Sequence, residues 1–188
     1  MSNTMSLERP FFSTIKTKTI AAFAAVFAAV ALPQLFHLVG AISGYGTVPG
    51  EIFLPMHLPI LLVGLLAGPI AGFVAGFCGP IVSSALSGMP IVAVLPFMVI
   101  ELAFYGFVAG LMAQTKIPVM GKLLIAQIAG RTVRAVAVLI AVYGINIETI
   151  AVASIWRTVG TGLAGLILQW SLLPLIVFWI ENKNKKDQ

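Results

Sequence analysis

Four ionisable side chains fall within long apolar stretches of the chain, where they could hold a charged ligand. They are Glu101, Arg131, Arg134 and Arg157. Each costs at least about 2.5 kcal/mol at the centre of a membrane helix, so each is expected to face the protein interior or a cavity. One carboxylate cannot neutralise three guanidinium groups, whose planar fork suits a carboxylate or a phosphate. These residues indicate an anion site, and the alternative is a structural ion pair between Glu101 and one arginine.

The spacing of the arginines predicts which of them share a helix face. Gln127, Arg131 and Arg134 are four and then three residues apart, which places them on one side of a helix. Arg157 belongs to a second polar stripe on the last apolar stretch. From the predicted topology, we expect Arg134 and Arg157 in the outer half of the membrane and Arg131 and Glu101 near its middle.

A second group of candidate substrate-binding residues gathers around a glycine-rich segment, residues 40–52. We predict this segment to be an external loop that closes over a ligand as a lid, since loops of about a dozen residues are often functional. A single histidine is more often structural, but two of them flank this loop. The candidates are His37, Tyr45, Glu51, Met56 and His57.

The chain carries no recognisable catalytic set of its own. It has no nucleophile elbow, no cluster of metal ligands and no phosphate-binding loop that ends in Gly-Lys-Ser/Thr. The single cysteine, Cys78, lies in an apolar run and is expected to be a small buried side chain. We therefore expect a protein that is not an enzyme and that binds no cofactor, metal or nucleic acid.

The composition predicts an all-α membrane protein that must position these residues. The 188 residues are 60% hydrophobic and 9% charged, whereas soluble domains have about 25% charged residues. A helix needs about 20 apolar residues to cross a bilayer. We predict six transmembrane helices in one domain, residues 1–188. The expected spans are 18–39, 53–67, 69–86, 91–113, 123–143 and 151–180.

The distribution of positive charge predicts the orientation of the chain. Three of the 11 Lys and Arg residues are the arginines within the spans. The others all fall in the segments that lie on the side of the termini. Because positive residues collect on the inner side, both termini should be cytoplasmic, with tails over residues 1–16 and 181–188.

Proline, glycine and alanine mark sites of special packing. The pair Gly68-Pro69 predicts a break between two short helices, because proline removes a backbone donor and clashes with the preceding turn. Irregular backbone at membrane depth needs protein or a wet cavity around it, which favours a binding cavity here. Small residues four apart allow close helix approach, as for Gly72 and Gly76. The alanines of the first span, predicted to dock a partner or alternatively to pack internally, are Ala21, Ala25 and Ala29.

These motifs resemble the substrate-binding S components of energy-coupling factor (ECF) transporters, which are prokaryotic vitamin importers. The resemblance covers nearly the whole chain. Besides six spans and the alanine-rich first helix, it includes the motifs Leu54-Pro-Met-His-Leu-Pro59, Gly64, Gly68-Pro69, Gly72, Gly76, Pro80, Ser87-Gly-Met-Pro90 and Glu101-Leu-Ala-Phe-Tyr-Gly106.

The resemblance implies a binding subunit of the prokaryotic plasma membrane that captures a vitamin in an outer pocket and topples to release it inside. Its partners would be a transmembrane coupling protein and two cytoplasmic ABC ATPases, docked at the alanine face. The arginines would match an anionic vitamin or precursor, such as pantothenate or nicotinate. The alternatives are a self-sufficient ion-coupled carrier, which usually shows inverted repeats that we do not find here, and an intramembrane enzyme.

Overall fold

The structure, a computed structural model, describes residues 12, 14–144 and 160–186. These residues contain six helical segments long and apolar enough to cross a membrane, and no strand. The predicted all-α membrane protein with six spans is thereby confirmed. The helices are α1 (Ile15–Ile42), α2 (Val48–Phe53), α3 (His57–Ala67), α4 (Pro69–Ser87), α5 (Leu95–Met112), α6 (Val119–Leu139), the π-helical turn η1 (Ile140–Gly144) and α8 (Leu163–Lys186).

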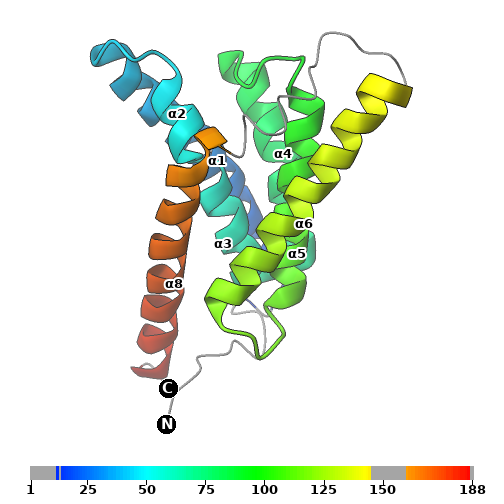
Figure 1. The fold of residues 1–188 in the computed structure, drawn as a ribbon. Coiled ribbons are helices and arrows are strands. Elements are labelled where there is room, and N and C mark those ends of the chain that lie inside the picture. The colour runs from blue at the N-terminus through cyan, green and yellow to red at the C-terminus, as the bar shows by residue number, and fades with distance from the viewer. Residues whose placement is uncertain (1–11, 13, 145–159, 187–188) are drawn as a thin grey trace.

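The long helices run up and down in one bundle (Figure 1). The first turn of α1 and the last turn of α8 lie at the same end. The short helix α2, the α4–α5 connection and η1 lie at the other end, which we call the α2 end. The cytoplasmic placement of both termini stays a prediction.

Glycines allow α3, α4 and α5 to pack with their backbones in contact. A Cβ atom added at Gly72 would collide with the backbone of Gly106, and one added at Gly76 would collide with that of Leu102. A Cβ atom at Gly64 would lie 3.1 Å from that of Ala109. The predicted close packing at Gly72 and Gly76 is therefore confirmed, and it places the backbone of α4 against that of α5.

The alanine face of α1 serves internal packing. Ala25 is 6% exposed and Ala29 is fully buried, and both belong to the core cluster formed with α3, α4 and α5. Ala21 is partly buried against the same cluster. A Cβ atom at Gly79 of α4 would lie 3.2 Å from the Ala29 Cβ. The burial of Ala25 and Ala29 supports the alternative of internal packing, because α4 approaches α1 there. Whether the alanine face also docks a partner stays a prediction.

Several helix ends differ from the predicted ones by a few residues, and two of these differences change a predicted loop or tail. Residues 40–52 are not one loop, because α1 continues to Ile42 and α2 begins at Val48. Pro49 stands in the first turn of α2, where its missing N–H costs nothing and its fixed φ favours a helix. The predicted tail over residues 181–188 is helical as far as Lys186, since no Gly or Pro interrupts it. The predicted tail over residues 1–16 lies mostly outside the described residues.

Polar side chains attach α8 to α6 inside the bundle. Gln127 of α6 donates a 2.8 Å hydrogen bond to Gln169, and it accepts a 2.7 Å hydrogen bond from the Trp170 indole. Gln169 is fully buried. The backbone of α2 at Phe53 also closely approaches α8 at Gly165. Helix α8 thereby contacts both α6 and α2.

Candidate functional site

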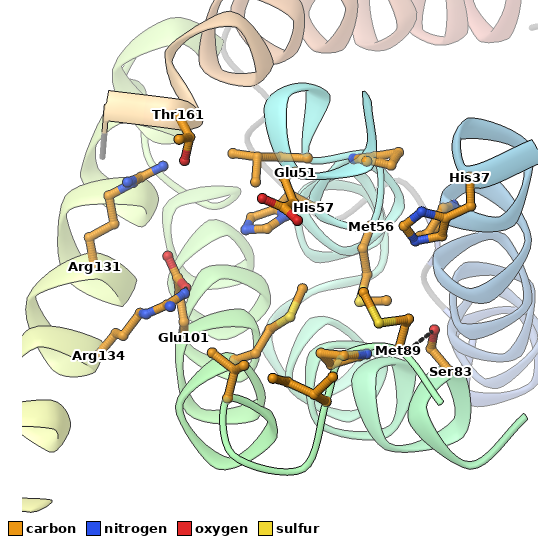
Figure 2. A pocket seen from close by; sticks show the side chains of 18 residues that line it. His37, Glu51, Met56, His57, Ser83, Met89, Glu101, Arg131, Arg134 and Thr161 are labelled. Atoms are coloured by element: carbon orange, nitrogen blue, oxygen red, sulfur yellow. Dashed lines mark hydrogen bonds and ion pairs between the residues drawn. The ribbon is translucent and has the colours of Figure 1, made fainter. Parts of the chain in front are cut away.

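A cavity of about 440 Å³ opens within the α2 end of the bundle. Its walls come from the last turns of α1 and α4, the first turns of α3 and α5, the middle of α6 and the residue Thr161 ahead of α8. Figure 2 shows its lining from close by. The lining residues are Pro33, His37, Gly50, Glu51, Leu54, Pro55, Met56, His57, Ser83, Met89, Pro90, Ile91, Val94, Met98, Glu101, Arg131, Arg134 and Thr161.

The junction between α2 and α3 forms one wall of the cavity. Leu54 ends α2 with a φ of 49°, in the left-handed region that residues other than glycine and asparagine seldom adopt. Its carbonyl accepts a hydrogen bond of 3.1 Å from the His57 backbone N–H, which starts α3. Met56 and His57 are each 3% exposed. This turn therefore directs both side chains inward.

The α4–α5 connection is folded back onto α4 by serine hydroxyls. Ser83 donates a 2.8 Å hydrogen bond to the Met89 carbonyl, and Ser84 donates one of the same length to the Pro90 carbonyl. Gly88 ends α4 with a φ of 71°, which suits glycine. The sequence Ser-Gly-Met-Pro over residues 87–90 thus forms a fixed wall beside the cavity.

Charged groups occupy the wall built by α5 and α6. The Arg134 guanidinium donates from Nη1 to Glu101 Oε2 at 2.5 Å, and the two side chains are 13% and 1% exposed. The second carboxylate oxygen of Glu101 is buried and has no hydrogen-bond partner among the described residues. Arg131, one helical turn earlier on α6, has its Nε and Nη2 atoms buried without a hydrogen-bond partner in the same part of the chain.

Helix packing explains why these charges meet. A Cβ atom at Gly130 of α6 would collide with the ring of Tyr105, which is fully buried on α5. The same ring lies edge-on to the His57 ring, with centroids 5.3 Å apart. Tyr105 therefore fixes the spacing of α3, α5 and α6 behind the polar wall.

The two sides of the cavity differ in chemistry. Figure 2 shows Arg131, Arg134, Glu101 and Thr161 on one side, and Met56 and Met89 across the cavity from them. His57 and Glu51 lie between. A buried guanidinium without a hydrogen-bond partner for two of its nitrogens is costly, so this arrangement can bind an anionic group of a small molecule.

The structure brings seven of the nine predicted substrate-binding residues together around this cavity. They are His37, Glu51, Met56, His57, Glu101, Arg131 and Arg134. Tyr45 does not line the cavity and is 69% exposed, because it lies in the turn between α1 and α2. Arg157 lies outside the described residues. Whether the seven bind a substrate stays a prediction.

The expected ion pair at Glu101 is present, with Arg134 as the partner. Glu51 reaches the cavity only at its exposed rim, where it accepts a 3.1 Å hydrogen bond from the Thr47 hydroxyl. His37 packs against the backbone of Gly50, where an added Cβ atom would lie 2.9 Å from its ring. His37 thus holds α2 beside the cavity as well as lining it.

Several residues that line the cavity were not predicted from the sequence. Met89 and Ser83 lie in or near the Ser-Gly-Met-Pro motif, whose prolines and glycine signalled irregular backbone without identifying a binding role. Pro33 and Met98 lie in apolar runs that carry no such signal. In the part of the chain that the structure describes, no group of three or more His, Cys, Asp or Glu residues could hold a metal ion.

The fold and the cavity define a multi-pass membrane protein with an open cavity among its helices, lined by charged residues on one side and by apolar residues elsewhere. Comparisons with models of known families, with curated proteins and with solved structures found no match to this chain.

Proposed function

We propose that this protein is the substrate-binding membrane subunit of an ATP-driven importer of the energy-coupling factor type. Its substrate is a small anionic metabolite, such as a vitamin or vitamin precursor. The observation that carries the proposal is the cavity of about 440 Å³ with the buried Nε and Nη2 atoms of Arg131 at its wall. Small-molecule sites typically measure about 300 to 1,000 Å³.

The packing of the bundle favours a binding cavity that opens at one end and argues against a continuous channel. The cavity lies at the α2 end, while backbone contacts at Gly64, Gly72 and Gly106 close the opposite half. These contacts leave no space between the backbones of α3, α4 and α5 on the way from the cavity to the other end of the bundle. Release on that side requires a rearrangement, which fits a subunit driven by partner proteins.

The required partners are a transmembrane coupling protein and two cytoplasmic ATPases. The chain has no Gly-Lys-Ser/Thr phosphate-binding loop with which to hydrolyse ATP. The predominance of positive residues on the side of the termini supports cytoplasmic ends in a prokaryotic plasma membrane. The cavity at the α2 end would then face outward, as capture from outside requires.

Reconstitution separates this function from that of a self-sufficient carrier. Liposomes that contain this protein alone should not accumulate labelled pantothenate or nicotinate under a proton or sodium gradient. Mild purification from native cells should recover a membrane protein and two ATPases in the same complex. Gradient-driven accumulation by the chain alone, or purification without any ATPase after cross-linking in cells, would contradict the proposal.

A further inference from the structure

The two described arginines of the cavity differ in their surroundings, although both lie on one face of α6. Arg134 donates to Glu101, a carboxylate that is 1% exposed. Arg131 shows no ion pair to a carboxylate among the described residues, and its Nε and Nη2 atoms are buried without a hydrogen-bond partner there. The wall built by α5 and α6 therefore has one net positive charge, at Arg131, while the exposed Glu51 carboxylate of α2 also lines the cavity.

The unpartnered atoms of Arg131 also have the geometry of a carboxylate site. Nε and Nη2 form one edge of the planar guanidinium, and two parallel hydrogen bonds from such an edge match the two oxygens of a carboxylate. Low effective dielectric strengthens such a pair. A neutral amide or alcohol at this place would leave the buried positive charge uncompensated.

A second negative charge on the ligand would meet an unfavourable neighbour. Glu101 keeps one carboxylate oxygen buried without a hydrogen-bond partner among the described residues, on the same side of the cavity as Arg131. The described wall also has no second uncompensated positive charge to balance such a ligand, because Glu101 already neutralises Arg134. The wall therefore disfavours phosphates and dicarboxylates, which a pair of unneutralised arginines would favour.

The rest of the cavity suits an apolar body with few polar groups. Met56, Met89 and Met98 line it together with Pro33 and Ile91. Methionine adapts to irregular apolar shapes. The Ser83 hydroxyl donates to Met89, and each lining histidine, His37 and His57, leaves a buried Nδ1 atom without a partner among the described residues. Each of these two ring nitrogens can form a hydrogen bond with one polar group of the ligand.

We infer that the cavity selects a monocarboxylate with a largely apolar body, anchored by Arg131, while Glu101 neutralises Arg134 and excludes doubly charged ligands. This inference rests on the proposed function and specifies its substrate. It assigns different roles to two arginines that are one helical turn apart. The ligand should carry one carboxylate and no phosphate.

Matched ligand pairs test the charge rule on the purified protein. The pairs are nicotinate with nicotinamide, and pantothenate with panthenol, each a carboxylate with a neutral analogue. Quinolinate adds a second carboxylate to nicotinate. In calorimetric titrations, at least one acid should bind about 30-fold or more tightly than its neutral analogue. This factor corresponds to the smallest loss that is typical when one partner of a buried charge pair is removed. Quinolinate should bind more weakly than nicotinate. Equal affinity for acid and neutral analogue would overturn the inference.

Variants assign the charge to Arg131. Arg131→Gln should abolish the preference for the acid, and Arg131→Lys, which keeps the charge without the fork, should retain a reduced preference. Glu101→Gln should raise the affinity for quinolinate relative to nicotinate. The control is Lys116→Gln, which also removes one positive charge but at an exposed residue beyond the end of α5. A preference for the acid that survives Arg131→Gln would overturn the assignment.

Small molecules that co-purify with the protein provide a test that does not depend on the probes. They are released from the purified wild type and identified by mass spectrometry. A monocarboxylate supports the inference, whereas a neutral, phosphorylated or dicarboxylic ligand overturns it and leaves the binding function intact. If neither a probe nor any co-purified small molecule binds, the proposed function itself is contradicted.

Discussion

Arg134 of α6 and Glu101 of α5 form an ion pair of 2.5 Å within the bundle, at the wall of its cavity. The pair joins two spans through side chains that are 13% and 1% exposed. The pairing offsets the cost of several kcal/mol that each of these buried charges would carry without a partner. The pair therefore fixes the rotation of α6, and with it the direction of Arg131.

The first prediction concerns the stability contributed by this pair. Glu101→Gln leaves Arg134 without its carboxylate and should destabilise the protein by about 3–5 kcal/mol. The double variant Glu101→Gln/Arg134→Gln should recover most of that loss, because two amides can bond to each other. Thermal unfolding in detergent measures both, with Lys116→Gln as the control. A single variant as stable as the wild type would refute the account of the pair.

The second prediction concerns the contact between Gly72 and Gly106. An alanine at either position places its Cβ atom against the backbone of the other helix. Such overpacking typically costs about 1–3 kcal/mol, and here rigid backbone must move. Gly144→Ala is the matched control, since its Cβ would lie 3.7 Å from the nearest atom, Ile140 Cγ2. Folded yield on size-exclusion chromatography should fall for Gly72→Ala and Gly106→Ala alone. Equal yields for all three variants would contradict the packing.

The third prediction concerns the attachment of α8. Gln169→Leu removes the acceptor of the 2.8 Å hydrogen bond from Gln127, and hydrogen bonds between membrane helices contribute about 0.6–2 kcal/mol. The unfolding midpoint should fall modestly. Ser171→Ala should have no effect, because the Ser171 hydroxyl is exposed and bonds only its own helix at Ile167. If the two variants behave alike, the hydrogen bond does not stabilise the α6–α8 contact.

The fourth prediction separates the two faces of α1. Ala25→Trp should prevent folding, because Ala25 is 6% exposed within the core. Ala24→Trp, one residue away on an exposed face, should give folded protein that still binds ligand. Fluorescence-detected chromatography compares the two. A well-folded Ala25→Trp variant with normal ligand binding and no uptake would instead favour a partner-docking role for Ala25.

Most of the architecture follows from composition, because long apolar runs in a membrane have few alternatives to helices. The breaks at Gly68 and Gly88 were also predictable from their glycine–proline surroundings. The end of the first loop was not, since Pro49 can equally end a loop or begin a helix such as α2. The alanines of α1 show a similar limit, because small residues permit close approach without identifying the neighbour.

The sequence predicted which kinds of residue form the candidate site, but it did not predict which of them pair with each other. Seven of the residues predicted from buried charges and from the surroundings of the first loop do line the cavity, and their binding of a substrate stays a prediction. That Glu101 pairs with Arg134 and not with Arg131 depends on how α5 and α6 rotate about Gly130 and Tyr105. Those contacts join residues far apart in the sequence. The methionines of the opposite wall had no distinguishing neighbours in the sequence.

The central claim is that the cavity at Arg131 holds a small molecule for import. Native mass spectrometry of the protein, released gently from detergent after purification from cells grown in rich medium, tests it most directly. The account predicts a single bound small molecule per chain, which Arg131→Gln loses and Lys116→Gln keeps. A wild-type protein that carries no small molecule, or an Arg131→Gln variant that keeps it fully bound, would contradict the account.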